Sequence, residues 1–243
     1  MKRAVGIGIL VLAAAAPAWA FDDKDDLKAA AKKLSDAPSY SWTTTSKNNA
    51  EGAGGGGGAG NPSIEGKSVK DGPTWISMKR GENTIEAAFK GDKFAVKVKD
   101  VWMGSEDAPG AQGGRPDPSL FMARMLKAVK PGAQGLGESL DKIQNLKSEG
   151  GGVYTAEFTP DGAKDQLAPK VDGQQAVLNF TDTKGTIKLW VKDGMLVKVE
   201  STLQGKMMFG QREREINRTS ITEFKDIGTT KLDLPDEAKK KLE

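Results

Sequence analysis

Apolar residues recur along this chain with two different periods, which divide it into helices and strands. From Leu27 to Leu34 they follow the i, i+3, i+4, i+7 spacing of one helical face, which predicts an amphipathic helix over residues 22–35. Aspartates gather at the start of this segment and lysines near its end, as the helix dipole favours. From Tyr40 the period becomes two, which is typical of β-strands.

Short alternating segments separated by Gly, Asp and Asn predict a meander of antiparallel strands with one dry face. The clearest run covers residues 94–98, and the clearest pair flanks Asp193-Gly194, a dipeptide typical of tight hairpin turns. Because alternate side chains share one face of a strand, the apolar members of these runs are expected to face inward together. They are Phe94, Val96, Val98, Ile187, Leu189, Val191, Val197 and Val199.

A second, more apolar helix is predicted in mid-sequence. Residues 104–118 are rich in Gly and Pro, and Ser119 is then expected to cap a helix that runs to about Lys130. Apolar residues cover more than half of its circumference, which predicts burial between surfaces. The residues expected to pack into the hollow of the sheet are Phe121, Met122, Met125 and Leu126.

Two interpretations of this sheet and helix remain open. The first is an ordinary core of sheet and helix. The second is a half-barrel whose concave face holds an apolar ligand, with the central helix as a plug or lid. Methionine suits such a surface because its flexible thioether adapts to ligands of varied shape, and curved sheets form apolar pockets at their mouths.

Residues 1–20 have the pattern of a secretory signal peptide. Lys2 and Arg3 precede an apolar run, and Ala18-Trp19-Ala20 matches the small-x-small pattern of a cleavage site. We expect cleavage after Ala20 and export to the periplasm or beyond the cell, with no integral membrane segment left after cleavage. Residues 21–243 are predicted to form a single domain with a flexible Gly-rich loop at 52–60.

The composition narrows the chemistry that the chain can perform. It has no His and no Cys, which excludes Ser-His and Cys-His nucleophile pairs, disulfides and the usual zinc sites. Its 36 Lys and Arg nearly balance its 33 Asp and Glu, so no excess positive charge favours nucleic acid. The carboxylates Glu213 and Glu215 alternate with arginines, which indicates cross-strand ion pairing rather than catalysis. We expect no catalytic residue, no metal and no cofactor.

Several segments also carry a family resemblance in their order. They are YSWTTT from residue 40, LFMARMLKAV from residue 120, GTIKLWVKDGMLVKVES from residue 185, EFKDIG from residue 223 and LDLP from residue 232. This order resembles the LolA-like superfamily of bacterial envelope lipoprotein and lipid carriers, including the mycobacterial LppX/LprG-type proteins. The resemblance implies an unclosed barrel wrapped around helices, with an apolar cavity for acyl chains. The Cys of the lipoprotein members is missing here, so that membrane tether is not expected.

The fold expected from these observations is α+β: a strongly curved antiparallel sheet, or unclosed half-barrel, wrapped around a central apolar helix, with an amphipathic helix at the N-terminus. The function expected first is non-catalytic binding of a lipid, an acyl chain or an acylated protein, as an outer membrane lipoprotein carrier would perform. The alternative is an envelope sensor or scaffold that uses the same fold to recognise a partner protein. An enzyme that uses carboxylates of the meander is the third.

Overall fold

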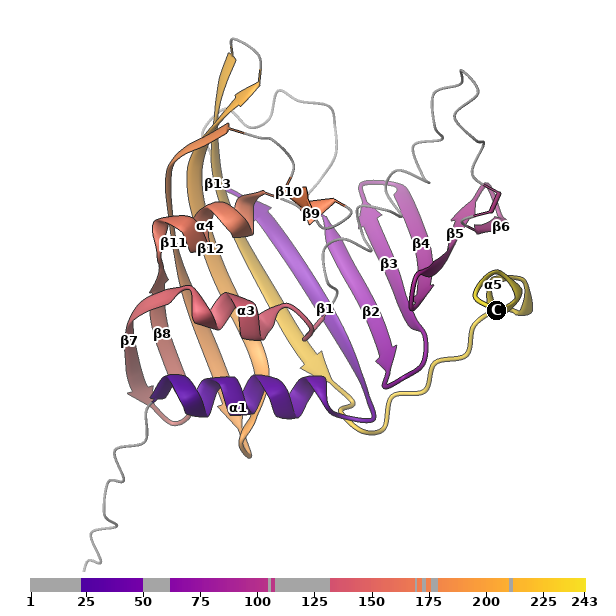
Figure 1. Ribbon diagram of the computed structural model, residues 1–243, viewed down its shortest axis with the longest axis horizontal. Coiled ribbons are helices and arrows are strands. Elements are labelled where there is room, and N and C mark those ends of the chain that lie inside the picture. Colours follow the sequence, from indigo (N-terminus) through magenta and orange to yellow (C-terminus); the bar gives the residue numbers. More distant parts are fainter. Residues whose placement is uncertain are drawn as a thin grey trace, which may run out of the picture.

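An antiparallel sheet of 11 strands forms the framework of the chain (Figure 1). The computed structural model describes residues 23–49, 62–104, 106–107, 132–168, 170–171, 174–175, 179–209 and 212–243. The strands follow the order β6-β5-β4-β3-β2-β1-β13-β12-β11-β8-β7, and β9 and β10 form a separate pair. Since β6 and β7 stand at the two ends of this order, the sheet is open.

The strands of the sheet are β1 (Ser39–Asn48), β2 (Ser63–Val69), β3 (Thr74–Arg80), β4 (Asn83–Lys90), β5 (Lys93–Val98), β6 (Val101–Gly104), β7 (Ile143–Gly150), β8 (Val153–Phe158), β11 (Asn179–Lys192), β12 (Met195–Phe209) and β13 (Arg212–Lys225). The small pair is β9 (Lys170–Val171) and β10 (Gln174–Gln175). The helices are α1 (Asp23–Ser35), α3 (Leu136–Asp141), α4 (Pro160–Leu167) and α5 (Asp236–Lys241).

The sheet curves strongly, and α1, α3 and α4 lie on its concave side (Figure 1). The apolar face of α1 is buried there, as its 3.6-residue spacing predicts, and α4 contacts β8, β11 and β12. The predicted curved antiparallel sheet and its N-terminal amphipathic helix are confirmed. The predicted helix at 119–130, the Gly-rich loop at 52–60 and the signal peptide lie outside the described residues.

The concave face carries the main hydrophobic core. Of the residues predicted to face inward, Phe94, Val96, Ile187, Leu189 and Val199 are buried in one cluster together with the apolar face of α1. Val98 and Val191 are partly buried and pack against the same cluster. The two-residue alternation therefore places seven of the predicted strand residues in this cluster, although they come from opposite parts of the sheet.

Val197 departs from the predicted alternation. The turn at Asp193-Gly194 has φ angles of 53° and 68°, as a tight hairpin requires, but a β-bulge follows it. Trp190 pairs with Lys198, whereas Val191 pairs with Leu196, so Val197 is the extra residue and lies outside the core cluster. Leu196, with no exposed surface, occupies the core in its place.

A second, smaller core lies on the opposite face of β4, β5 and β6. Ala88, Ala95 and Trp102 pack there against Leu234 and other residues of the C-terminal segment that contains α5. Ala87 and Val96 point to the concave core from the same strands. This end of the sheet is therefore covered on its convex side by the end of the chain.

We expect Gly66→Ala to lower the free energy of unfolding by about 1–3 kcal/mol through overpacking. Gly66 pairs with Trp42, whose indole lies directly over it, so that an added Cβ would stand only 2.1 Å from Cζ2 of the ring. Urea denaturation measures the loss. Gly137→Ala in α3 is the matched control: its Cβ meets nothing within 4 Å, so this variant should be as stable as the natural chain or up to about 1 kcal/mol more stable.

Candidate functional site

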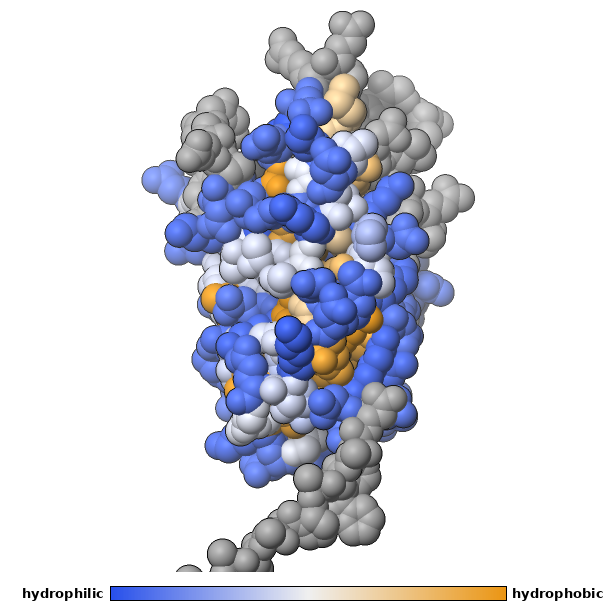
Figure 2. Space-filling view, turned by 90° about the vertical axis from the view of Figure 1, so that its left-hand side faces the viewer, coloured by the Kyte–Doolittle hydropathy of each residue, from blue (hydrophilic) through white to orange (hydrophobic). Residues whose placement is uncertain are grey.

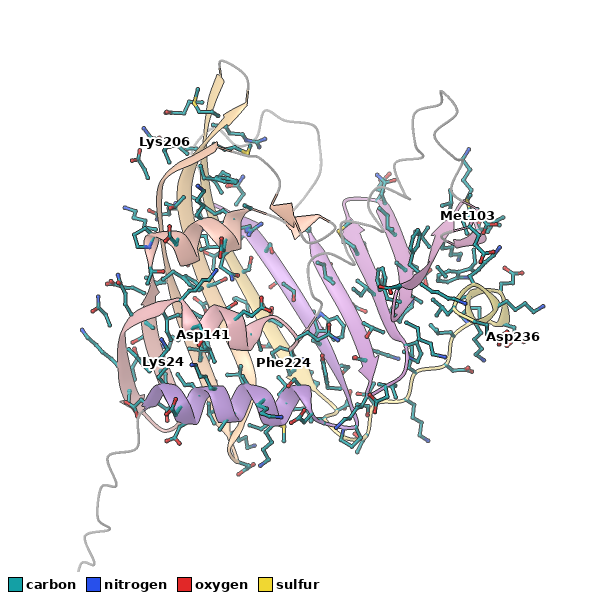
Figure 3. All side chains as sticks on the ribbon, in the orientation of Figure 1. Lys24, Met103, Asp141, Lys206, Phe224 and Asp236 are labelled. Carbon is teal, nitrogen blue, oxygen red and sulfur yellow. The ribbon has the colours of Figure 1, made fainter. Side chains whose placement is uncertain are left out.

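An aromatic floor is formed on the concave face by Tyr40, Trp42 and Phe224, which belong to the central strands β1 and β13. The rings of Tyr40 and Trp42 lie 5.7 Å apart and those of Tyr40 and Phe224 lie 6.0 Å apart, and all three residues are buried. Phe224 stands near the end of the sheet that α1 crosses, whereas Lys206 stands at the far end of the neighbouring strand (Figure 3). Burial raises the pKa of the Tyr40 phenol above its ordinary value.

Gly132 and Ala133, which follow the apolar segment at residues 119–130, contact the aromatic floor. The backbone N–H of Ala133 donates a hydrogen bond to the Tyr40 hydroxyl at 3.2 Å. Gly132 lies so close that a Cβ there would stand 2.8 Å from the Tyr40 ring. The chain that follows residue 131 is therefore fixed over β1, in the middle of the concave face.

Asp107, which precedes the apolar segment, is held beside the edge strand β6. The carboxylate of Asp107 accepts a hydrogen bond from the backbone N–H of Gly104 at 2.7 Å and pairs with Lys241 of α5 at 2.6 Å. The two described residues on either side of segment 108–131 therefore lie apart: Asp107 is beside the edge strand β6, and Gly132 lies against Tyr40 of β1.

We expect Lys241→Gln to raise the pKa of Asp107 toward its ordinary value. The Lys241 ammonium, and then the Gly104 N–H, lower this pKa in the folded chain. A depressed carboxyl pKa stabilises the fold above the unfolded value, so the docking of α5 should weaken as pH falls through the folded pKa of Asp107. An NMR titration of the Asp107 carboxyl measures the shift. Lys240→Gln, in the same helical turn, should leave it unchanged.

A band of hydroxyl groups crosses the concave face beyond the aromatic floor. Thr44 and Thr222 are hydrogen-bonded through their hydroxyls at 2.9 Å, and so are Ser46 and Ser220. Ser201 pairs with Ser220 across the next strand. These residues keep part of their surface exposed, unlike the aromatic residues below them. The concave face thus changes from apolar to polar along its central strands.

Arg218 follows the hydroxyl band on the same face. It pairs with Asn48 of β1 on one side and with Leu203 of β12, which is 3% exposed, on the other. Its Nη2 donates one long hydrogen bond of 3.4 Å to the carbonyl oxygen of Gln166 in α4. The side chain keeps contact with solvent, but the surrounding protein removes part of its water and so lowers the pKa of the guanidinium.

Grooves formed by described residues include one of about 510 Å³ and one of about 450 Å³. The larger contains Ile187 but is otherwise lined mainly by polar residues on the other face of β8, β11 and β12, such as Thr155, Glu157 and Lys188. The smaller is lined by residues of β1, β2 and β13. Seen from the β7 side, hydrophobic residues lie recessed among hydrophilic ones (Figure 2).

The predicted ligand-binding residues are thus brought together in part. Seven of the eight strand residues share the concave core, Val197 does not, and Phe121, Met122, Met125 and Leu126 lie outside the described residues. Arg218 and the hydroxyl band were missed. The signal was present, because Arg218, Ser220 and Thr222 alternate with Phe224 and share its face.

Three further features concern metal binding, membrane spans and the carboxylates of β13. Among the described residues, no group of three or more His, Cys, Asp or Glu side chains could hold a metal ion. Within the same residues, no helix is long and apolar enough to cross a membrane. The cross-strand ion pairing expected for Glu213 is confirmed by its contact with Lys206 at 3.3 Å.

Comparison with known proteins gives structural matches but no sequence match. No protein-family model matches the chain, and no curated protein does. The crystal structure of the lipoprotein LppX from Mycobacterium tuberculosis is similar at 12% identity and a TM-score of 0.46, covering 87% of this chain and 97% of that one. LprF from Mycobacterium bovis is similar at 13% identity and a TM-score of 0.46, covering 89% and 97%.

A LolA superfamily protein from Nitrosomonas europaea is similar at 11% identity and a TM-score of 0.32, covering 88% of this chain and 95% of that one. The solved structures to which this chain is similar thus include an LppX protein and a LolA superfamily protein.

Proposed function

We propose that this chain is an exported, non-catalytic protein that holds the acyl chain of a lipid or of an acylated protein in the hollow of its sheet, and that it acts as a carrier in the bacterial envelope. The observation that supports this most directly is the open, strongly curved sheet whose concave face is apolar over nearly its whole width. Such a surface is suited to a long apolar ligand rather than to a polar one.

We propose that the apolar segment over residues 119–130 completes the binding surface. The helices α1 and α4 contact strands in the half of the sheet from β12 to β7. The other half carries buried Phe94 and Val96, and the chain leaves this half at Asp107 and returns over β1 at Gly132. We propose that Phe121, Met122, Met125 and Leu126 face this half, and that the acyl chain lies between them and the sheet.

The expected affinity follows from the apolar surface of the ligand. Each buried methylene contributes about 0.8 kcal/mol, so about ten of them contribute ~8 kcal/mol. This equals the free energy of binding at a Kd of about 1 μM, before the cost of ordering a flexible chain is subtracted. A fatty acid of ordinary length is therefore a sufficient probe.

Titration of residues 21–243 with a fluorescent fatty acid tests the proposal. We expect saturable uptake at one site with a Kd in the micromolar range, and displacement of the probe by an unlabelled fatty acid. A folded protein that takes up no probe, and that yields no lipid when its organic extract is analysed after isolation from its own host, would overturn it.

Protein recognition is the second candidate, and one observation favours it. Val101 is 60% exposed on the edge strand β6, and an edge strand presents unpaired backbone groups to which a strand of another protein can add. This function predicts a specific partner whose binding is the same with and without added lipid. A pull-down with Val101→Lys as the comparison distinguishes it from lipid uptake.

A further inference from the structure

We propose that Arg218 binds the anionic head group of the ligand, so that the lipid taken up carries a phosphate or carboxylate at the end of its acyl chain. This inference rests on the proposed function. It adds the chemical class of the ligand and its orientation in the site. The acyl chain would point to the aromatic floor, and the head group would stand at the level of Arg218.

The strand register places Arg218 on the concave face. Residues directly opposite each other in an antiparallel sheet point to the same side. Arg218 lies opposite Leu203, which is buried in the concave core, and six residues before Phe224, which is in the same core. Its hydrogen bond to Gln166 of α4 agrees, because α4 packs on that side.

The concave face changes in polarity along these strands in the manner that an amphiphile requires. Tyr40, Trp42 and Phe224 form the apolar end, and the hydroxyl pairs of β1 and β13 follow. Arg218 comes next, about 20 Å from Phe224 at ~3.3 Å per residue. An acyl chain of ordinary length spans such a distance, and its polar end would then meet the guanidinium.

Among the described residues, Arg218 uses few of its hydrogen-bond donors. A guanidinium has five N–H donors, and the hydrogen bond described for this side chain uses one of them at 3.4 Å. Within the described parts of the chain, none of the ion pairs involves Arg218, whereas Lys206 of β12 pairs with both Asp182 and Glu213. A guanidinium that has no carboxylate partner among the described residues can form a charge-assisted hydrogen bond with an anion.

Arg218 also stands near the C-terminal end of α4, where a cation is favoured by the helix dipole. A purely structural role of this kind predicts a different result on substitution. Loss of the contact between Arg218 and the C-terminal end of α4 would lower the stability of the fold and would weaken the binding of all ligands equally. Loss of a head-group contact would affect anionic ligands alone.

The experiment compares two pairs of fluorescent probes with identical acyl chains. One pair is a fatty acid and its methyl ester, and the other is a lysophosphatidic acid and the matching monoacylglycerol, each used below its aggregation concentration. We expect the natural chain to bind each anionic probe at least about tenfold more tightly than its neutral partner, as a charge-assisted hydrogen bond allows. The tighter of the two anionic probes identifies the head group as carboxylate or phosphate.

Arg218→Gln is expected to remove this preference while leaving the affinity for the neutral probes within about twofold, and Arg218→Lys should restore part of it. Lys47→Gln is the matched control, because Lys47 lies on the neighbouring strand opposite Thr219 and points to the other face. This variant should keep the full preference. Thermal denaturation of all three variants shows whether they remain folded.

Each other outcome has a separate meaning. If both members of each pair bind equally and Arg218→Gln changes nothing, the head-group contact is wrong while the proposed function stands. The same holds if Arg218→Gln weakens all four probes equally and lowers the melting temperature, which is the result of a structural cap. If no probe of either kind binds the folded chain, the proposed function itself fails.

Discussion

Trp42→Ala is expected to lower the free energy of unfolding by about 3–5 kcal/mol, the range for removal of a large buried aromatic side chain. Trp42 is 4% exposed and fills the centre of the concave face. Its ring lies over Gly66, contacts Tyr40, and stands 3.3 Å from where a Cβ of Gly132 would be. Removal of the indole would therefore leave a cavity between three segments that are distant in the sequence.

Chemical denaturation followed by circular dichroism measures this loss, and Trp190→Ala is its control. Trp190 is only partly buried, with the Nζ atoms of Lys198 and Lys188 at 4.6 and 5.6 Å from its ring centre. Cation–π contacts of this kind contribute about 1 kcal/mol, so the control should lose about that much. Equal losses in the two variants would contradict the placement of Trp42 at the centre of the core.

Met125→Lys is expected to reduce the uptake of a fluorescent fatty acid at least tenfold while the chain stays folded. The sequence puts Met125 on the apolar surface of the predicted central helix, which we propose to face the acyl chain. An ammonium there would have to be buried beside methylenes without a partner, which is costly. If the hollow that we propose is open in the chain without ligand, the same ammonium would reach water there, and the fold would be kept.

Uptake and melting temperature are measured on the same preparation. Lys127→Gln, on the polar side of the same predicted helix, should change neither. If Met125→Lys unfolds the chain, the residue belongs to a filled core and the hollow that we propose does not exist. If uptake stays unchanged, Met125 does not face the ligand.

Much of the fold could be predicted from the period of apolar residues. The face of α1 and the inward residues of β5 and β11 follow from spacing alone, because local spacing decides which side of an element is dry. The edge strands β6 and β7 could not be found in this way. β7 buries little beyond Ile143, and β6 has four residues, so neither shows an alternating pattern of useful length.

The candidate site was harder to predict, because its polar part depends on the register between strands. Alternation predicts that Val197 faces the core, but a bulge, which adds one residue to one strand of a pair, leaves it outside the core cluster. The alternation of Arg218 with Phe224 already places both residues on one face of β13, but spacing within one strand does not tell which residues of the neighbouring strands share that face. The position of Arg218 on the concave face becomes evident once it is paired with Leu203 of the neighbouring strand.

The central claim is that this curved sheet holds a lipid, and native mass spectrometry of the chain from its own host tests it most directly. We expect a species heavier than residues 21–243 by the mass of one acylated molecule, which is released as an anion on collisional activation and is absent from Met125→Lys. A natural chain that appears only at its bare mass, and remains so after incubation with fatty acid and lysophosphatidic acid, would contradict the account.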